Sequence, residues 1–222
     1  MVSILKNTVI AAAIYDMKTQ LNKNGIFIMQ KITLIFQKDN GQSIELDFHE
    51  ELHLMITGLP ENKREMIVEA IRGQLQAMPD TEVVEITGNI AVSQKKSMLQ
   101  DILQELQTRY CTMADLGMKT IVDYNQVSAG KWNYIVVLID YHPVSGNDDE
   151  VDDLICKLAQ KGRAAGIHLV LNAAKTPSLM VCANFPARFV GNTAPKIAKG
   201  LSENEVGLFY SYGKKGEKRI LD

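Results

Sequence analysis

The stretch that decides the fold is residues 161–171, which read Lys-Gly-Arg-Ala-Ala-Gly-Ile-His-Leu-Val-Leu. Its apolar run at 168–171 follows a predicted helix over about 149–164, and Gly166 separates the two. A short, continuous apolar run is typical of a strand that is buried on both faces of a sheet. We therefore expect this stretch to lead the chain from a covering helix into the centre of a parallel sheet.

The same alternation of helix and strand extends over the chain from residue 51 onward. Further buried strands are predicted at 52–56, 82–86, 134–139 and 187–190, and amphipathic helices at about 66–75 and 99–113. This order predicts an α/β fold whose mostly parallel sheet carries helices on both faces. Residues 51–222 are expected to form this core as one domain.

Residues 1–50 are predicted to form a helix and a β-hairpin that connect to the core. The helix is expected over 1–24 from the spacing of its apolar residues. The hairpin is expected because Asn40-Gly41 separates the apolar runs 32–36 and 44–46.

Composition excludes several classes of protein. With 222 residues and 46% hydrophobic content, the chain can bury one substantial core. Its formal net charge of -2 lacks the basic excess that nucleic-acid binding usually requires, so no nucleic acid is expected as a partner. The apolar stretch 8–15 is too short to span a membrane, so membrane attachment is expected only through the rest of a longer protein.

Neither the cysteines nor the histidines indicate a metal site. Cys111, Cys156 and Cys182 are far apart and odd in number, which favours reduced thiols in the core of a cytoplasmic protein. The four histidines lack metal-ligand spacing.

Three stretches together resemble the FtsK/SpoIIIE-type ATPases. Residues 161–171, followed by Asn-Phe-Pro-Ala-Arg at 184–188, are similar to the family's RAAGIHL strand and NFPxR segment. Upstream, the helix ending in Arg109-Tyr110 and the Tyr124-Asn125 turn after it are similar to a helix and turn of the family. The strand 134–140 resembles the family's Walker B strand. The resemblance implies a RecA-like P-loop NTPase fold.

The resemblance places the phosphate-binding loop at 58–65, which reads Gly-Leu-Pro-Glu-Asn-Lys-Arg-Glu against the pattern G-x-x-x-x-G-K-[ST]. Gly58 keeps the first glycine, whereas Lys63 and Arg64 replace the second glycine and the lysine. Glu65 replaces the hydroxyl that binds magnesium. Binding of ATP with Mg²⁺ is therefore not expected, although Lys63 and Arg64 leave weak phosphate contact open.

The groups that activate water are also changed. Asp140 stands at the Walker B aspartate, but Tyr141 replaces the glutamate that follows it. Residues 172–177, Asn-Ala-Ala-Lys-Thr-Pro, lack the Gln-Arg pair that the family uses to sense phosphate. Tyr141 and His142 are adjacent on a strand and should point to opposite faces, so they are not expected to share an acid–base site. No catalytic residue is expected, and the vestigial nucleotide site comprises Gly58, Lys63, Arg64 and Asp140.

Two arginines of the matching motifs have two interpretations. Arg163 and Arg188 could reach the nucleotide of a neighbouring module as arginine fingers, or they could form structural contacts within the chain.

The resemblance also implies a role. Degenerate modules of this family occur in the membrane coupling ATPase of type VII secretion systems. The chain is therefore expected to be a non-hydrolysing cytoplasmic module that docks on neighbouring ATPase modules, regulates them and helps to recognise helical secreted proteins of the WXG type. A cleft beside Leu59, Pro60 and Met66 would suit an apolar helix. A weakly active ATP-binding translocase module and a DNA-translocase fragment remain the alternatives.

Overall fold

The computed structural model describes residues 33–37, 43–47, 53–142, 149–191, 206–210 and 219–221. The helix predicted over 1–24 lies outside the described residues, as does the Asn40-Gly41 turn of the predicted hairpin.

A seven-stranded sheet forms the centre of the molecule, in the order β4-β5-β6-β3-β7-β8-β9. Its strands are β3 (Leu54–Thr57), β4 (Thr81–Ile86), β5 (Tyr134–Tyr141), β6 (Ile167–Ala173), β7 (Ala187–Val190), β8 (Val206–Tyr210) and β9 (Arg219–Leu221). The first five in spatial order are parallel, whereas β8 and β9 are antiparallel. Strands form at all five predicted positions, with ends that differ by at most two residues, but β4 at the edge of the sheet is only partly buried.

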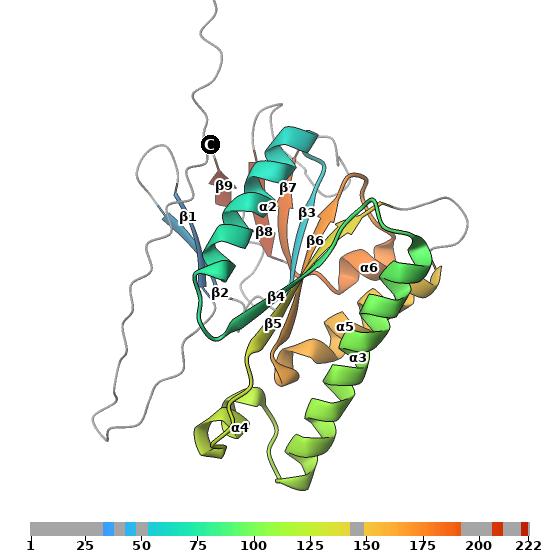
Figure 1. Cartoon of the computed structure of the whole chain (residues 1–222). Coiled ribbons are helices and arrows are strands. Elements are labelled where there is room, and N and C mark those ends of the chain that lie inside the picture. Colours follow the sequence, from blue (N-terminus) through green and yellow to red (C-terminus); the bar gives the residue numbers. More distant parts are fainter. Residues whose placement is uncertain are drawn as a thin grey trace, which may run out of the picture.

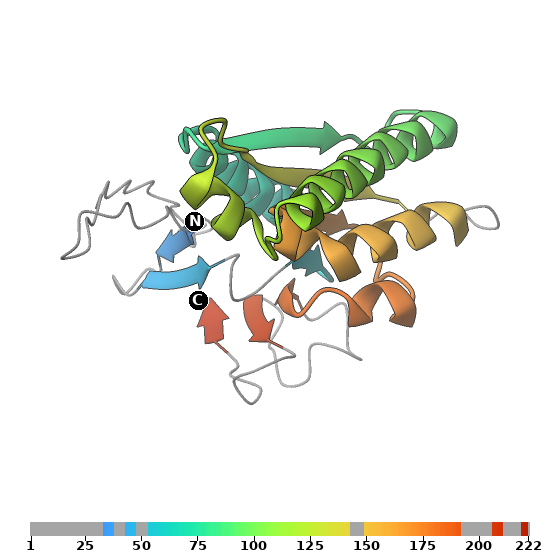
Figure 2. The ribbon, with the colours of Figure 1, turned by 90° about the horizontal axis from the view of Figure 1, so that it is seen from below.

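Helices cover both faces of this sheet, which confirms the predicted α/β class (Figure 1). They are α2 (Glu61–Gln76), α3 (Val92–Asp115), α4 (Ile121–Val127), α5 (Asp149–Lys161), the 3-10 turn η1 (Gly162–Ala165) and α6 (Leu179–Ala183). Helix α2 lies on one face, and α3, α5 and α6 lie on the other, as the view from below also shows (Figure 2).

The predicted hairpin is confirmed and packs on the α2 face. Strands β1 (Thr33–Gln37) and β2 (Ser43–Asp47) pair antiparallel. Phe36 is fully buried, and its ring meets that of Phe189 in β7 at a centroid distance of 4.8 Å. The Gln74 side chain of α2 bonds both backbone groups of Ile35, at 2.8 and 3.0 Å. The hairpin therefore contributes to the core.

The amino ends of β5 and β6 are tied to α3 by Arg109. This buried side chain donates from Nη1 to the carbonyls of Asn133 and Ala165, both at 2.9 Å. Its guanidinium also lies 5.4 Å from the centre of the Trp132 ring, which stacks on Tyr124. The motifs that carry the family resemblance thus meet at this end of the sheet, where they hold elements together.

Two expectations about this region are wrong. The stretch around Tyr124-Asn125 is not a turn but part of α4, because Thr120 and Asp123 form a capping box that starts a helix. Cys111 is not a core thiol, since it lies on the exposed side of α3, although Cys156 and Cys182 are buried as expected.

Candidate functional site

The segment at the phosphate-loop positions is mostly helical. Only Gly58, Leu59 and Pro60 separate β3 from α2, and the helix begins at Glu61. The backbone amides of Lys63 and Arg64 both donate to the Pro60 carbonyl at 3.1 Å. These amides therefore close the first turn of α2.

The short connection packs tightly against the end of β7. Gly58 has a positive φ of 69°, and the Gly191 amide donates to the Thr57 carbonyl at 3.1 Å. A Cβ atom on Gly191 would lie 2.3 Å from the Gly58 carbonyl oxygen. Leu59 is buried in the core, so the expectation that it lines an open cleft is wrong, whereas Met66 is exposed.

The guanidinium of Arg64 is turned into the protein. Arg64 is 6% exposed, its Nε donates to the Leu59 carbonyl at 3.3 Å, and its Nη1 donates to Asn172 Oδ1 at 2.8 Å. The partner Asn172 stands near the end of β6, next to β3 in the sheet. Arg64 thus joins the start of α2 to the strand that the resemblance assigns to phosphate sensing.

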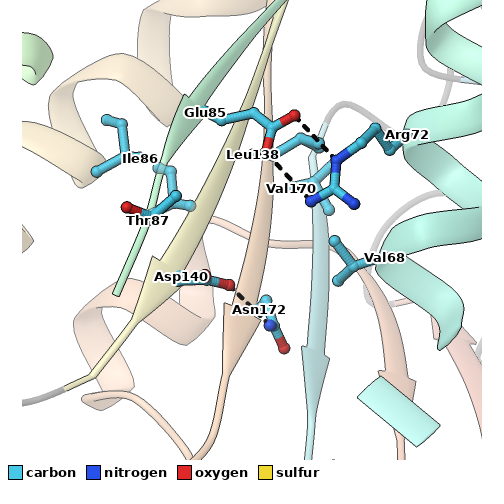
Figure 3. A pocket seen from close by; sticks show the side chains of 10 residues that line it. Val68, Arg72, Glu85, Ile86, Thr87, Leu138, Asp140, Val170 and Asn172 are labelled. Carbon is cyan, nitrogen blue, oxygen red and sulfur yellow. Dashed lines mark hydrogen bonds and ion pairs between the residues drawn. The ribbon is translucent and has the colours of Figure 1, made fainter. Parts of the chain in front are cut away.

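Asn172 is also hydrogen-bonded to Asp140. Its Nδ2 donates to Asp140 Oδ1 at 2.8 Å (Figure 3). The Gly88 amide donates to Asp140 Oδ2 at 3.3 Å. A continuous chain of hydrogen bonds therefore runs from Arg64 through Asn172 and Asp140 to the end of β4. Of the predicted vestigial residues, the structure brings Arg64 and Asp140 together through Asn172.

Lys95 also contacts this end of the sheet, and the sequence motifs did not point to it. Lys95 is 9% exposed, and its ammonium donates to the carbonyls of Gly88 at 3.2 Å and of Asp140 at 3.5 Å. Lys95 precedes Leu99 by four residues, which places it on the buried side of α3. That spacing was the available signal.

Tyr141 serves the other face of the sheet. Its hydroxyl donates to Asp152 Oδ1 in α5 at 2.8 Å, and Ser178 Oγ donates to Asp152 Oδ2 at 3.2 Å. His142, by contrast, is exposed, and its ring lies close to Gly88. The expectation that Tyr141 and His142 do not share one site is confirmed.

A small pocket opens beside Asp140 and Asn172, between α2 and the strands β4, β5 and β6 (Figure 3). Arg72 and Glu85 form its rim through two hydrogen bonds of 2.9 and 3.1 Å. The pocket has room for about one water molecule. It is too small for a nucleotide or for an apolar helix.

The two arginines from the family motifs lie apart from this edge. Arg163 is exposed in η1, just before the amino end of β6. Arg188 is half-buried in β7 and donates to the carbonyls of Phe185 at 2.8 Å and Cys182 at 2.6 Å. Arg188 therefore makes structural contacts within the chain, and Arg163 alone of the two is available at the surface.

Two kinds of feature are absent from the described part of the chain. No group of three or more His, Cys, Asp or Glu side chains there is placed to hold a metal ion. No helix there combines the length and the apolar character that crossing a membrane requires.

Sequence comparison finds DNA translocases. No family model matches the chain. The DNA translocase FtsK of Leptospira interrogans is 27% identical over 204 residues, covering 74% of this chain and 21% of that protein. FtsK of Chlamydia muridarum is 26% identical, covering 81% of this chain and 28% of the relative. The chain thus spans between a fifth and a third of the length of these curated relatives.

Comparison with solved structures finds the same fold in coupling and secretion proteins. The pCW3 conjugation coupling protein TcpA, in its monomer form with ATPγS, aligns with a TM-score of 0.68 at 16% identity, over 86% of this chain and 66% of that one. The cytoplasmic domain of EssC gives 0.65 at 14% identity, over 86% and 44%. That of the Thermomonospora curvata type VII secretion ATPase EccC gives 0.62 at 13%, over 85% and 28%.

The sequence relatives support the resemblance suggested by the motifs at 161–171 and 184–188, and the structural neighbours support the α/β fold. The chain is similar in sequence to FtsK-type DNA translocases, and it shares the fold of the conjugation coupling protein TcpA and of the type VII secretion ATPase EccC.

Proposed function

We propose that this module does not hydrolyse ATP and that it acts by docking on, and regulating, neighbouring ATPase modules of a secretion coupling protein. The observation that carries the proposal is the position of Arg64. A residue at the lysine position of a phosphate-binding loop would have to face the nucleotide, yet Arg64 is buried and bonded to Leu59 and Asn172.

The residues at this edge do not fit a magnesium triphosphate. A phosphate cradle needs several backbone amides turned inward, but Pro60 has none and those of Lys63 and Arg64 are bonded to the Pro60 carbonyl. Glu61 and Glu65 add exposed carboxylates at the positive end of α2, where they compete with an anion. Asp140 already accepts two hydrogen bonds from within the chain.

Water activation lacks a base in the same way. Tyr141, at the position of the family's glutamate, donates a hydrogen bond from its hydroxyl to Asp152 on the opposite face of the sheet. A phenol held in this way neither reaches a water beside Asp140 nor accepts its proton. The vestigial site of Gly58, Lys63, Arg64 and Asp140 is thus proposed to be structural.

The proposed partners follow from the neighbours in structure. EccC is named as a type VII secretion ATPase, and one EssC structure is named as containing ATPases 2 and 3. We propose that this chain is likewise one module of a longer, membrane-anchored protein with its ATPase modules in the cytoplasm. Helical secreted proteins of the WXG type are its proposed substrates for recognition.

Calorimetric titration with Mg-ATP tests the nucleotide part of the proposal. We expect no binding at up to about 1 mM nucleotide, a concentration that detects even weak sites, and no ATP turnover. An active FtsK motor in the same assay provides the positive control. Micromolar binding, or turnover that disappears in Asp140→Asn, would overturn the proposal and favour a weakly active ATPase with Lys63 and Arg64 as phosphate ligands.

The docking part is tested separately. Adding this module to an adjacent ATPase module from the same polypeptide should change the turnover rate of that module, with and without a WXG-type protein present. An unchanged rate and no co-purification of the two modules would contradict the docking role.

A DNA-translocase fragment is the second candidate, because the sequence relatives bear that name. The formal charge of -2 weighs against it, since phosphate-backbone binding depends on clustered Lys and Arg. A gel-shift experiment with duplex DNA at moderate salt should show no retardation. Retardation that weakens as salt rises would favour the DNA-binding reading instead.

A further inference from the structure

The last two residues of β5 serve opposite faces of the sheet. Asp140 accepts hydrogen bonds from Asn172 and Gly88 on the α2 face, whereas Tyr141 donates to Asp152 on the face of α5 and α6. Successive side chains of a strand point to opposite faces, so neighbouring residues can hold both layers at once. We propose that residues 140 and 141 are the centre of a two-sided lock, which fixes the amino ends of α2 and α6 relative to each other.

The α2 half of the lock depends on a buried cation. Among the described residues, Arg64 makes no ion pair, and its guanidinium is bonded to a carbonyl oxygen and an amide oxygen. A buried charge is costly unless hydrogen bonds compensate it. Moving the start of α2 away from β6 would leave the Arg64 guanidinium without its Asn172 acceptor. This contact therefore holds α2 against Asn172, which in turn is bonded to Asp140.

The α6 half depends on a buried carboxylate. Asp152 is 8% exposed, and its two oxygens accept from the hydroxyls of Tyr141 and Ser178. Ser178 is also the N-cap of α6, where its Oγ accepts from the Val181 amide at 3.4 Å. The start of α6 is therefore connected through Asp152 to the end of β5.

The two halves share the same strand end, which makes them one device. Asp140, Tyr141 and Asn172 stand at positions that the family resemblance assigns to nucleotide chemistry, and all three are engaged within the chain. In this respect the inference rests on the proposed function. The lock keeps the exposed side chains of Leu179 and Met180 on α6 in one arrangement with α2, whether or not nucleotide is present.

Hydrogen exchange of the full chain, followed by mass spectrometry, tests the lock. Tyr141→Phe removes one donor to Asp152 and should speed exchange of the α6 amides by about tenfold. Arg64→Met keeps the length of the side chain but removes its donors, and should speed exchange in the first turns of α2 by a similar factor. Tyr110→Phe is the matched control, because its hydroxyl bonds the Lys161 carbonyl outside the lock, and both segments should keep their wild-type rates.

Two outcomes would overturn the lock. Wild-type exchange rates in both segments of the variants would mean that these contacts hold nothing, and equal acceleration of all peptides would mean only general destabilisation. The proposed function fails by a different readout, namely protection of residues 58–65 in the wild-type protein when Mg-ATP is added. The two failures are therefore distinguishable.

Discussion

Lowering the pH from about 7.5 to about 5 is expected to destabilise the folded chain through His53. This side chain is 1% exposed and bridges two elements. Its Nδ1 accepts from the Leu169 amide at 3.0 Å, so Nε2 carries the proton and donates to the Ala159 carbonyl at 2.7 Å. Both contacts require the neutral ring, because a protonated Nδ1 cannot accept a hydrogen bond.

Burial, and then the nearby His168, lower the pKa of His53 from 6.5 to about 3. Unfolded chains take up a proton below about pH 6.5, whereas the folded protein resists it until about pH 3, so the unfolded state binds more protons in this window. The free energy of unfolding therefore falls as the pH falls. At about pH 5 the difference amounts to about 1.5 pKa units, or about 2 kcal/mol.

Urea denaturation at both pH values measures this loss, which corresponds to a fall of about 4–8 °C in melting temperature for a chain of this size. His53→Asn is the control, since an amide offers one donor and one acceptor but does not titrate. The variant should lose about 2 kcal/mol less than the wild type between the two pH values. An equal loss in both proteins would refute the assignment of the acid sensitivity to His53.

Four substitutions probe the scaffold. Arg109→Met should lower the free energy of unfolding by about 3 kcal/mol, because two backbone carbonyls lose a buried donor; a loss below about 1 kcal/mol in urea titrations would contradict this role. Gly166→Ala should cost about 2 kcal/mol or more, since its φ is +73° and the new Cβ would lie 2.5 Å from Ile121 Cδ1. Gly73→Ala in α2 should instead raise the free energy of unfolding by about 0.5–1 kcal/mol in thermal melts, because the new Cβ would meet no atom within 4 Å. Phe36→Ala should cost about 3–4 kcal/mol in urea titrations if the hairpin belongs to the core, and a near-zero change would show that it does not.

The central buried strands could be predicted because each is a short apolar run covered on both faces, whereas β4 at the edge is only partly buried. The run at 187–190 is β7 to the residue, and that at 168–171 lies within β6. Helix α4 was missed because seven residues are too few for a periodic signal, and its start depends on the Thr120–Asp123 capping box. Exposure of Cys111 depends on which side of α3 it faces, since Arg109 and Met113, two residues before and after it, are buried.

The residues of the candidate site could be identified from the sequence, but their contacts could not. The sequence indicates that Arg64, Glu65 and Tyr141 depart from the family pattern. It does not indicate that Arg64 turns inward to Asn172, because that contact joins residues 108 apart in the chain. The same holds for Tyr141 and Asp152, whose pairing depends on how α5 packs across the sheet.

The location of the recognisable motifs explains how a family resemblance can be seen whether or not the family's chemistry is retained. Arg109 and η1 lie at the amino ends of β5 and β6, whereas Arg64 and Asp140 lie at the carboxyl ends. The eight residues of β5 separate these edges by about 20 Å or more. Packing constrains the first edge, because a change at a buried residue there, such as Arg109, opens the core. At the carboxyl edge, nucleotide binding constrains the residue types only in a module that binds nucleotide. Otherwise they are constrained by the internal hydrogen bonds that we propose as a lock. Similarity at the amino edge therefore reports the fold, and activity has to be judged from the residues of the carboxyl edge alone.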